Sequence, residues 1–506
     1  MPTSGPPPAS RSARKTWLFR TAAVLIGLSP LVACEAVLTA FDWGRPSWYD
    51  DPFVGFSAVY PLFELDESGT RYEIPRSRRA YFRPESFASQ KAANEYRIFC
   101  LGESTTQGSP YGIETSYTTW LELALTAADP SRQWEIVNCG GISYASYRLV
   151  PILDEVLQHQ PDMIVIYVGQ NEFLEDRTFH HVKQMPRALS AAHEQLARLR
   201  TYTLFRSAAL DLTGRSREHL EKDKPVLRAE VDALLDYRGG LAQYHRDEKW
   251  REGVVRQYEF NLRKLAAMCR DAGVPLIFCN PVCNLRDCPP FKCQHRDNIA
   301  PAERERFNQL LDEARAVYAT DRHQALAMLR EAAKIDDRHA AVHYELGKFF
   351  EDLGMRDEAR AAFIRAKEED VCPLRILECM NEIVLDVARD TRTPLIDVRA
   401  MFDARSRSGI PGDDWLVDHV HPSFEGHQLI ANALAEKLIA QRVLTPRSDW
   451  ETVRQARYRD HLASLPAFYF LEGQERLRGQ TMWAQGRARR ERKPEALRPG
   501  ARVQPK

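Results

Sequence analysis

The sequence lacks any excess of charge of one sign. Its 70 Lys and Arg residues are matched by 70 Asp and Glu residues, and the pI is about 7.2. A protein that binds nucleic acid generally carries a basic excess or a basic patch. The balance therefore gives no reason to expect a nucleic-acid partner, and the 44% hydrophobic content is typical of a globular chain.

Cysteine is also scarce, with ten residues among 506. Four of them gather in one stretch, as Cys279, Cys283, Cys288 and Cys293. No CxxC pair occurs among them, so the ligand spacing typical of a structural zinc site is missing. Disulfide bonds among them are an alternative if this region is exported, and their pairing does not follow from the sequence.

Long hydrophobic runs are rare, and residues 21–41 form the most prominent one. As a helix this run spans about 31 Å, the thickness of a bilayer core. The basic residues before it are Arg11, Arg14, Lys15 and Arg20. They predict a cytoplasmic N-terminus and a main body outside the bacterial cell membrane, periplasmic or extracellular. A lipobox ending in Cys34 and a cleaved signal peptide are the alternatives, and both also export the body.

Five short runs have the composition of buried strands. They are Arg97–Leu101, Glu135–Asn138, Met163–Val168, Pro275–Cys279 and Pro394–Val398. Helical stretches at Tyr117–Ala127 and Tyr147–Gln158 separate the first three. Alternation of strands and helices predicts an α/β fold, with a parallel sheet covered on both faces.

A repeat interrupts this pattern between residues 304 and 370. Ala325, Leu329 and Ala332 recur 34 residues later as Ala359, Phe363 and Ala366. This period and these small residues are typical of tetratricopeptide units, whose paired helices approach closely. About two units are visible where roughly three are needed for independent stability, so the module should lean on the α/β body. Its helices suggest a surface for a protein or peptide partner.

These observations divide the chain into segments. We expect a disordered cytoplasmic N-terminus (1–20), a transmembrane anchor or signal segment (21–41) and an irregular stem (42–95). The α/β domain follows in two parts (96–301 and 372–445) around the repeats (302–371), and a C-terminal helical segment with a basic tail (446–506) ends the chain.

Residues that could take part in catalysis follow three of the strands. Ser104 lies on a tight turn after the first, Gly140 ends the second and Asn171 follows the third. The carboxyl ends of parallel strands meet at one edge, where open α/β sheets bind ligands. A serine there can act as a nucleophile, while a glycine N–H and an Asn amide can donate to an oxyanion.

A fourth stretch contains Asp418 and His421, three residues apart and ahead of an amphipathic helix. One turn can deliver both side chains, so that Asp418 fixes the imidazole and His421 accepts the Ser104 proton. His419 is the alternative base. Taken singly, each of the four stretches also fits an ordinary turn, a helix cap or a polar surface.

Together the four stretches resemble the four blocks of the SGNH (GDSL-type) hydrolase superfamily. They read Gly102-Glu103-Ser104, Asn138-Cys139-Gly140-Gly141, Gly169-Gln170-Asn171-Glu172 and Asp418-His419-Val420-His421. The resemblance covers about residues 95–182 and 255–442, apart from the repeats. It implies a flavodoxin-like three-layer α/β/α core, Ser104 as nucleophile, His421 as base with Asp418, and Gly140 and Asn171 as oxyanion donors. Glu103 and Glu172 depart from the pattern, which has Asp at both positions.

The resemblance also implies a reaction class, the hydrolysis of acyl esters, with O-acetyl groups on envelope sugars or lipid acyl esters as candidate substrates. An O-acyltransferase using the same residues is the first alternative. A non-catalytic scaffold whose repeats bind a partner is the second. The resemblance implies no cofactor and no metal. Arg286, after the fourth strand, either lines the pocket rim for an anionic substrate or is simply solvated.

Overall fold

The computed structural model describes residues 13–41, 43, 55–56, 61–175, 199–202, 204–205, 208, 226–227 and 231–487. The chain forms two compact units. One comprises Met1–Gly55 and His180–Val226, and the other Phe56–Phe179 and Leu227–Lys506. The second, larger unit contains every residue that the sequence places in the candidate site.

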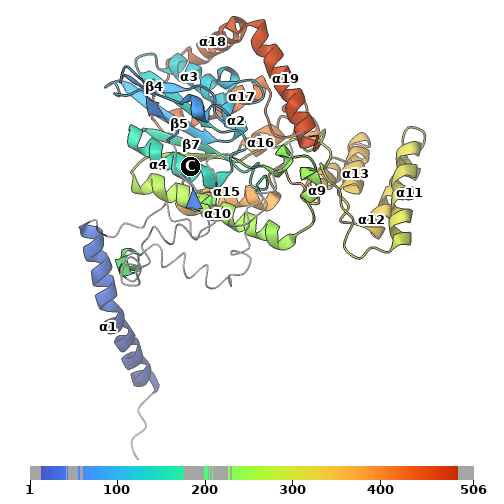
Figure 1. The fold of residues 1–506 in the computed structure, drawn as a ribbon, viewed down its shortest axis with the longest axis horizontal. Coiled ribbons are helices and arrows are strands. Elements are labelled where there is room, and N and C mark those ends of the chain that lie inside the picture. Colours follow the sequence, from blue (N-terminus) through green and yellow to red (C-terminus); the bar gives the residue numbers. More distant parts are fainter. Residues whose placement is uncertain are drawn as a thin grey trace, which may run out of the picture. The chain divides into compact units, whose positions relative to one another are not determined.

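A five-stranded parallel sheet forms the centre of the larger unit (Figure 1), with the order β10-β9-β7-β5-β6. Its strands are β5 (Glu95–Gly102), β6 (Gln133–Gly140), β7 (Met163–Tyr167), β9 (Leu276–Cys279) and β10 (Leu395–Ile396). Counted along the chain, this order is 2-1-3-4-5, as in flavodoxin. Gly102 pairs with Gly140 on one side and Tyr167 on the other, so β5, β6 and β7 end level. The order reverses between β5 and β7, which is where such sheets bind ligands.

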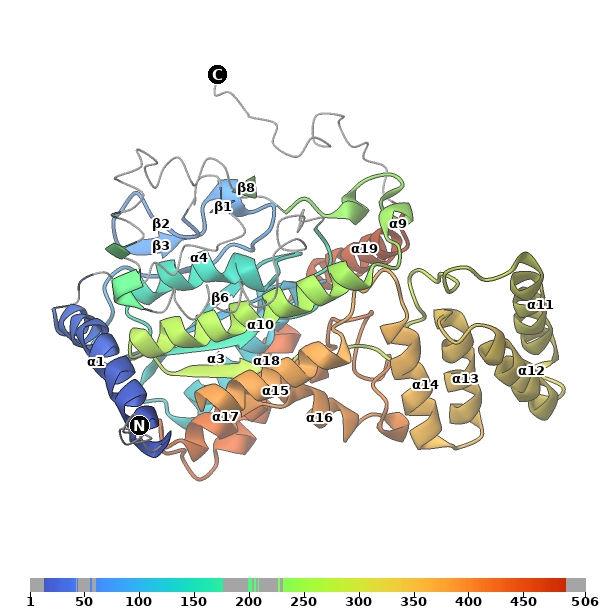
Figure 2. The ribbon, with the colours of Figure 1, turned by 90° about the horizontal axis from the view of Figure 1, so that it is seen from below.

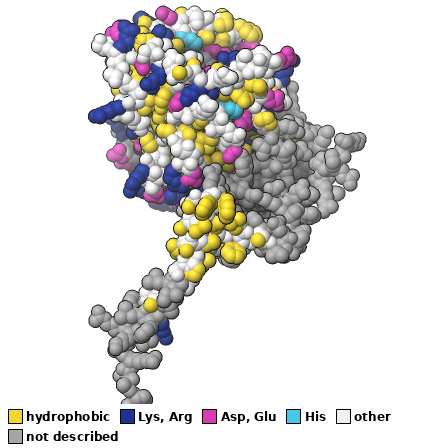
Figure 3. Space-filling model, turned by 90° about the vertical axis from the view of Figure 1, so that its left-hand side faces the viewer, with side chains coloured by type: hydrophobic (Ala, Val, Ile, Leu, Met, Phe, Trp, Pro, Cys, Tyr) yellow, Lys and Arg dark blue, Asp and Glu magenta, His cyan; other side chains and the backbone are white. Residues whose placement is uncertain are grey.

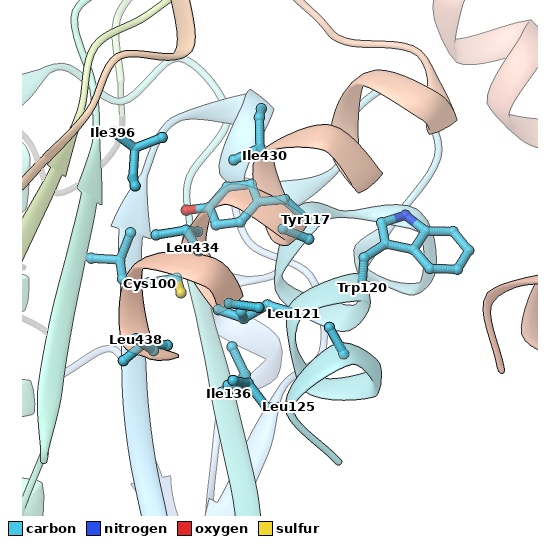
Figure 4. Packing of buried hydrophobic residues seen from close by; sticks show 14 of the residues in the cluster. Cys100, Tyr117, Trp120, Leu121, Leu125, Ile136, Ile396, Ile430, Leu434 and Leu438 are labelled. Carbon is cyan, nitrogen blue, oxygen red and sulfur yellow. The ribbon is translucent and has the colours of Figure 1, made fainter. Parts of the chain in front are cut away.

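Helices cover both faces of the sheet (Figure 2), so the predicted α/β class is confirmed. One face packs against α3 (Tyr117–Ala128) and α17 (Phe424–Ala440), and α18 (Trp450–Ser464) packs on α3. The other face packs against α4 (Ser146–Val156) and α10 (Glu248–Asp271), and α15 (Glu378–Thr391) packs on α10. Because strand side chains alternate between faces, Cys100 and Ile136 point to the first of these layers. There they pack against Leu121 of α3 and Leu434 of α17 (Figure 4).

Side-chain caps fix where the helices next to the sheet edge begin. The Ser116 hydroxyl accepts the Thr118 N–H at 3.3 Å at the start of α3, and the Ser423 hydroxyl accepts the Gly426 N–H at 3.2 Å at the start of α17. Each cap satisfies one of the N–H groups that a helix leaves unpaired. The remaining short elements are η1 (Arg76–Arg78), α2 (Ser104–Gln107), η2 (Ile113–Thr115), η3 (Leu157–His159), η4 (Leu234–Asp236), α9 (Gly240–Gln243), α16 (Val398–Asp403) and η5 (Arg407–Gly409).

Residues 61–95, the main described part of the segment expected to be an irregular stem (42–95), have a defined structure. They form an antiparallel sheet of β2 (Glu64–Leu65), β3 (Arg71–Glu73) and β4 (Ser86–Ala88). The backbone N–H groups of Leu62 and Phe63 donate to Glu155 of α4 at 2.6 and 2.8 Å. Phe87 packs edge-on against Phe99 of β5 at 5.2 Å between ring centres. This part of the predicted stem therefore belongs to the α/β body.

Four helices occupy the predicted repeat region: α11 (Pro301–Val317), α12 (Arg322–Ile335), α13 (Ala340–Asp352) and α14 (Arg356–Glu368). α11 pairs with α12, α13 pairs with α14, and α12 packs against α13. The six repeat positions Ala325, Leu329, Ala332, Ala359, Phe363 and Ala366 are all buried. A Cβ at Gly347 would lie 2.7 Å from the Phe363 ring, so this glycine lets α13 and α14 approach. The tetratricopeptide assignment itself stays a prediction.

The smaller unit contains α1 (Ala13–Ala40), which begins inside the segment expected to be disordered and continues through the predicted anchor. Among the described residues, no helix combines the length and the apolar character needed to cross a membrane. The transmembrane helix predicted over residues 21–41 is therefore not found, although the helix itself is. Glu35 interrupts its apolar character and accepts the backbone N–H groups of Arg200 and Thr201 at 2.7 and 2.9 Å.

The surface of the larger unit agrees with the balanced composition. Figure 3 shows a side of it where basic and acidic side chains are interspersed and neither sign gathers. Hydrophobic side chains are also visible along α1, where Val32 and Val37 are exposed. The two short strands β1 (Gly55–Phe56) and β8 (Val226–Leu227) pair with each other.

The expected C-terminal helical segment consists of α18 and α19 (Ala467–Ala484), and most of the basic tail lies outside the described residues. α19 holds the loop that follows α2. Arg476 donates to the carbonyl oxygens of Pro110 and Tyr111 at 2.7 and 2.6 Å, and Gln480 donates to the Ser109 hydroxyl at 2.6 Å. Helix α19 therefore supports the segment that follows Ser104.

Candidate active site

Ser104 is the first residue of α2, directly after β5, and only 8% of it is exposed. The turn into α2 is tight. A Cβ at Gly102 would lie 2.0 Å from the Thr106 hydroxyl oxygen and 2.4 Å from the Tyr167 carbonyl oxygen, so glycine is required there. As the first helical residue, Ser104 has a backbone N–H without a partner inside the helix. This N–H and the hydroxyl both lie at the carboxyl edge of the sheet.

A continuous chain of hydrogen bonds joins Ser104 to the turn before α17. His421 Nε2 lies 2.7 Å from Ser104 Oγ, and His421 Nδ1 lies 2.7 Å from Asp418 Oδ2. The two contacts use opposite nitrogens of one imidazole, so Nδ1 donates to the carboxylate and Nε2 accepts from the hydroxyl. The structure thus brings together Ser104, Asp418 and His421 as the sequence predicts, across more than 300 residues.

The Asp418 carboxylate is fixed and ionised. Its Oδ1 accepts the N–H groups of Val420 and His421, each at 2.9 Å. Burial acts to raise the pKa of Asp418, but the charge interactions with His421 and His419 and these hydrogen bonds outweigh it. The pKa therefore lies well below its ordinary value. An ionised Asp418 holds the His421 tautomer and stabilises the imidazolium when it forms.

His419, the alternative base, is directed elsewhere. Its Nδ1 lies 3.6 Å from Asp418 Oδ1, and its ring packs edge-on against Phe291. Burial lowers its pKa to about 4, so it is neutral at pH 7. His427 of α17 is also buried, and its Nδ1 accepts the Tyr117 N–H at 3.2 Å, while burial lowers its pKa to about 3. Of these three histidines, His421 is the one that hydrogen-bonds to Ser104.

Asn171 lies where the sequence predicts an oxyanion donor. Its backbone N–H donates to Glu103 at 3.0 Å, and one of its side-chain amide hydrogens is directed to the Tyr144 carbonyl at 3.2 Å. An amide carries two hydrogens, so the other remains for a ligand. The bond to Tyr144 also ties Asn171 to the loop that follows β6.

The prediction that Gly140 is the other oxyanion donor is not supported by its hydrogen bonding. Its N–H donates to the side-chain oxygen of Asn138 at 3.0 Å and is therefore occupied. The reason for glycine at this position is packing, because a Cβ would lie 2.2 Å from the backbone nitrogen of Gln107. Asn138 in turn donates to the Thr106 carbonyl at 2.6 Å, so the pair joins the end of β6 to α2.

Ser143 supplies a donor that the sequence did not reveal. In the loop after β6, the N–H of Gly141 donates to Gly102, that of Ile142 to Tyr81 and that of Tyr144 to Gly141. The Ser143 N–H has no hydrogen-bond partner within the described part of the chain. Its backbone has φ 61°, in the left-handed region that residues other than glycine rarely adopt. No sequence pattern signals such a conformation at a serine.

The two departures from the family pattern are buried acceptors. Glu103 accepts the N–H groups of Gly169, Gln170 and Asn171 at 3.0–3.1 Å, which fixes the turn after β7. Glu172 accepts the Ser146 N–H at 2.6 Å and the Ser146 hydroxyl at 2.9 Å at the start of α4. Burial and the charge of Glu172 raise the pKa of Glu103 to about 8, and the three N–H donors oppose that rise. Both glutamates therefore fix the loops at this edge of the sheet.

Arg286 is buried, so the prediction that it is solvated is wrong. It is 7% exposed and pairs with Asp287 at 3.0 Å and Asp414 at 2.8 Å. Its counter-ions are thus internal, and an anionic substrate is not needed to explain it. The stretch with Cys279, Cys283, Cys288 and Cys293 contains free thiols. Across the described residues, no group of His, Cys, Asp and Glu side chains is arranged to hold a metal ion.

Comparisons with known proteins yield structures only. No family model and no curated protein matches the chain. Among solved structures, an acetylxylan esterase from Geobacillus stearothermophilus is 13% identical, covers 71% of this chain and 99% of its own, and has a TM-score of 0.30. A lipase/acylhydrolase from Enterococcus faecalis is 12% identical, with 68% and 96% covered and a TM-score of 0.29. A protein assigned to the G-D-S-L lipolytic family from Desulfitobacterium hafniense is 11% identical, with 67% and 98% covered and a TM-score of 0.28. At these values the functional argument rests on the site itself.

Proposed function

We propose that this protein is a serine esterase that transfers the acyl group of an ester first to Ser104 and then to water. The observation that carries the proposal is the hydrogen-bonded series from Ser104 through His421 to Asp418, with 2.7 Å at both links. A serine hydroxyl is a weak nucleophile unless an adjacent base removes its proton. Here the base, its orienting carboxylate and the nucleophile are already in hydrogen-bond contact.

The first half of the reaction forms the acyl-enzyme. Ser104 Oγ attacks the ester carbonyl carbon while His421 Nε2 takes the hydroxyl proton, and the ionised Asp418 stabilises the imidazolium. The carbonyl oxygen becomes an oxyanion. When the tetrahedral intermediate collapses, the bond to the alcohol oxygen breaks and His421 returns the proton to that oxygen. The alcohol leaves, and the acyl group remains on Ser104.

Deacylation repeats these steps with water in place of the serine. His421 accepts a proton from the attacking water, and Ser104 Oγ leaves and recovers its proton from His421. In the transferase alternative, the hydroxyl of a sugar takes the place of water, with the same proton transfers. The two reactions therefore differ in the acceptor and not in the residues used.

Three N–H groups are the candidates for stabilising the oxyanion. They are the backbone N–H groups of Ser104 and Ser143 and the free amide hydrogen of Asn171. Donors fixed in advance at the position where charge develops lower the barrier without reorganisation. Glu103 supports this preorganisation because it fixes the turn that carries Asn171.

The substrate class follows from the chemistry of this site and from the expected location. Acyl esters of envelope molecules, O-acetyl groups among them, are the proposed substrates. The test uses purified protein with nitrophenyl esters of increasing acyl length, followed by acetylated polysaccharides with and without a free sugar acceptor. Hydrolysis in water supports the esterase. Product formation only when an acceptor is present supports the transferase. Absence of both, together with partner binding through α11–α14, would favour the scaffold.

The N-terminal segment is proposed to attach the protein to the bacterial membrane, with the α/β body outside the cytoplasm. The supporting observations are the basic residues before the apolar run and the exposed hydrophobic side chains of α1. Reporter fusions after Lys506 test the location. Replacing Cys34 by Ser tests lipid attachment, because loss of lipid labelling is expected only if that cysteine is modified.

The helices α11–α14 are proposed to be tetratricopeptide-like units that bind a protein or peptide. The support is the 34-residue period and the burial of all six repeat positions. The pair α13–α14 contacts the catalytic edge, since Ala359 and Phe363 share a buried cluster with Val420, the neighbour of His421. The repeats therefore stand beside the proposed active site.

A further inference from the structure

Gln170, the residue before Asn171, joins distant parts of the chain through its side chain. It is 2% exposed. Its side-chain oxygen accepts the Ile376 N–H at 2.7 Å, and its side-chain nitrogen donates to the Val282 carbonyl at 2.8 Å. Val282 precedes the four inserted helices and Ile376 follows them. One buried amide therefore connects the loop that carries Asn171 to both ends of the insertion.

The same connection continues into α14. The Lys367 ammonium group, 1% exposed, donates to the Ile376 carbonyl at 2.5 Å and to the Glu378 carboxylate at 2.7 Å. Ile376 is thus held on its carbonyl side by α14 and on its N–H side by Gln170. Buried hydrogen bonds of this kind are costly to break because the freed groups find no water.

In the other direction, the connection reaches the nucleophile. The Gln170 backbone N–H donates to Glu103 at 3.0 Å, and Glu103 directly precedes Ser104. The loop also has little free space, because a Cβ at Gly169 would lie 2.8 Å from the Ile376 side chain and 2.7 Å from the Tyr258 hydroxyl. A shift of Ile376 would therefore be transmitted to the loop from Gly169 to Asn171.

We infer that Gln170 is a positioning residue, which fixes Asn171 by tying its loop to the two ends of the helical insertion. Lys367 is a second positioning residue, which acts on the same loop through its hydrogen bond to Ile376. The inference rests on the proposed function, because it assumes that Asn171 donates to the oxyanion. It gives the insertion a role in the reaction, in addition to any partner that the helices bind.

A double-mutant cycle tests whether Gln170 acts through Asn171. The variants are Gln170→Met, Asn171→Ala and both together, assayed with nitrophenyl acetate. Methionine has a similar length and makes neither hydrogen bond. Gln170→Met alone should lower kcat about tenfold with little change in KM, and in the Asn171→Ala background it should cost less than about threefold, as coupled residues do. Gln309→Met, the same change on the exposed surface of α11, is the matched control.

Other outcomes distinguish the proposed role of Asn171 from the positioning role of Gln170. If Asn171→Ala has wild-type turnover, the proposed role of Asn171 fails, and the inference fails with it. If Asn171→Ala is impaired but the Gln170→Met loss is undiminished in its presence, or if Gln170→Met has wild-type kcat, only the positioning inference is wrong.

Two further variants guard against misfolding. Gln170→Glu, when protonated, offers the same acceptor and donor as the amide. Its kcat relative to wild type should therefore recover as the pH falls, whereas Gln170→Met should show no recovery. If Gln170→Met does not fold, Lys367→Met takes its place in the cycle and should show the same coupling to Asn171→Ala. Additive losses for Lys367→Met would then overturn the inference.

Discussion

The turn at residues 418–421 and the loop at residues 140–144 lie at the same edge of the sheet but present their functional groups in different ways. In the turn, the side chains of Asp418 and His421 make the decisive hydrogen bonds. In the loop, the groups proposed to bind the oxyanion are backbone N–H groups, and the N–H of Gly140 is already hydrogen-bonded to the Asn138 side chain. A role carried by a side chain is visible in the sequence, while a role carried by a backbone N–H depends on which neighbour accepts it.

The largest effect should come from the side-chain machinery. Ser104→Ala or His421→Ala should each lower turnover by about 10⁴–10⁶-fold, and the double variant should be hardly worse, because such residues act as a unit. His419→Ala should be affected far less, since His419 does not contact Ser104. Steady-state kinetics with a nitrophenyl ester measure all four proteins. An inactive His419→Ala beside an active His421→Ala would reverse the assignment of the base.

Smaller effects are expected at the two predicted oxyanion donors, and they should differ between the two residues. Asn171→Ala should lower kcat by about 10²–10³-fold with the fold intact, the usual cost of losing one donor. Gly140→Ala should instead destabilise the protein by about 1–3 kcal/mol, because the new methyl group meets the Gln107 backbone. Thermal melting together with kcat distinguishes these outcomes. A Gly140→Ala protein with wild-type stability and greatly reduced kcat would restore Gly140 as a donor.

Much of this architecture was accessible from the sequence. The five strands and the helices α3 and α4 follow from apolar runs of the right length, and Ser104, Asp418 and His421 follow from residue types that few other functions require together. The small sheet at residues 64–88 was not, since strands of two or three residues carry little pattern and pair with distant segments. The burial of Arg286 could not be predicted, because its partner Asp414 is more than 120 residues away along the chain.

A smaller effect should appear on acidification. His419 and His427 are buried with pKa values lowered to about 4 and 3, against about 6.5 in an unfolded chain. Between those values the unfolded state binds more protons, so this contribution to stability is complete above pH 6.5 and is lost as the pH falls toward 4. These two histidines therefore act to lower the melting temperature between pH 7 and pH 4, whereas Glu103, with its pKa raised to about 8, acts in the opposite direction. The difference between two proteins isolates the histidine contribution: on going from pH 7 to pH 4, the melting temperature of His427→Asn, which retains an acceptor for Tyr117, should fall less or rise more than that of the wild type. An equal change in the two proteins would contradict this account.

The smallest effect concerns Ser143. Glycine adopts positive φ without strain, so Ser143→Gly should leave kcat unchanged and raise stability by about 1 kcal/mol or less. The N–H that the account assigns to the oxyanion is retained in this variant. Calorimetry and kinetics on the same preparation measure both quantities. A large loss of kcat would show that the Ser143 hydroxyl, and not its N–H, is what the reaction uses.

The most direct test of the central claim is covalent labelling of the nucleophile. A fluorophosphonate reacts with an activated serine, and peptide mass spectrometry then locates the adduct. We expect one adduct, on Ser104, which is absent from Ser104→Ala and forms much more slowly in His421→Ala. Labelling of another residue, or full ester hydrolysis by the Ser104→Ala protein, would contradict the proposal that this site is a serine esterase.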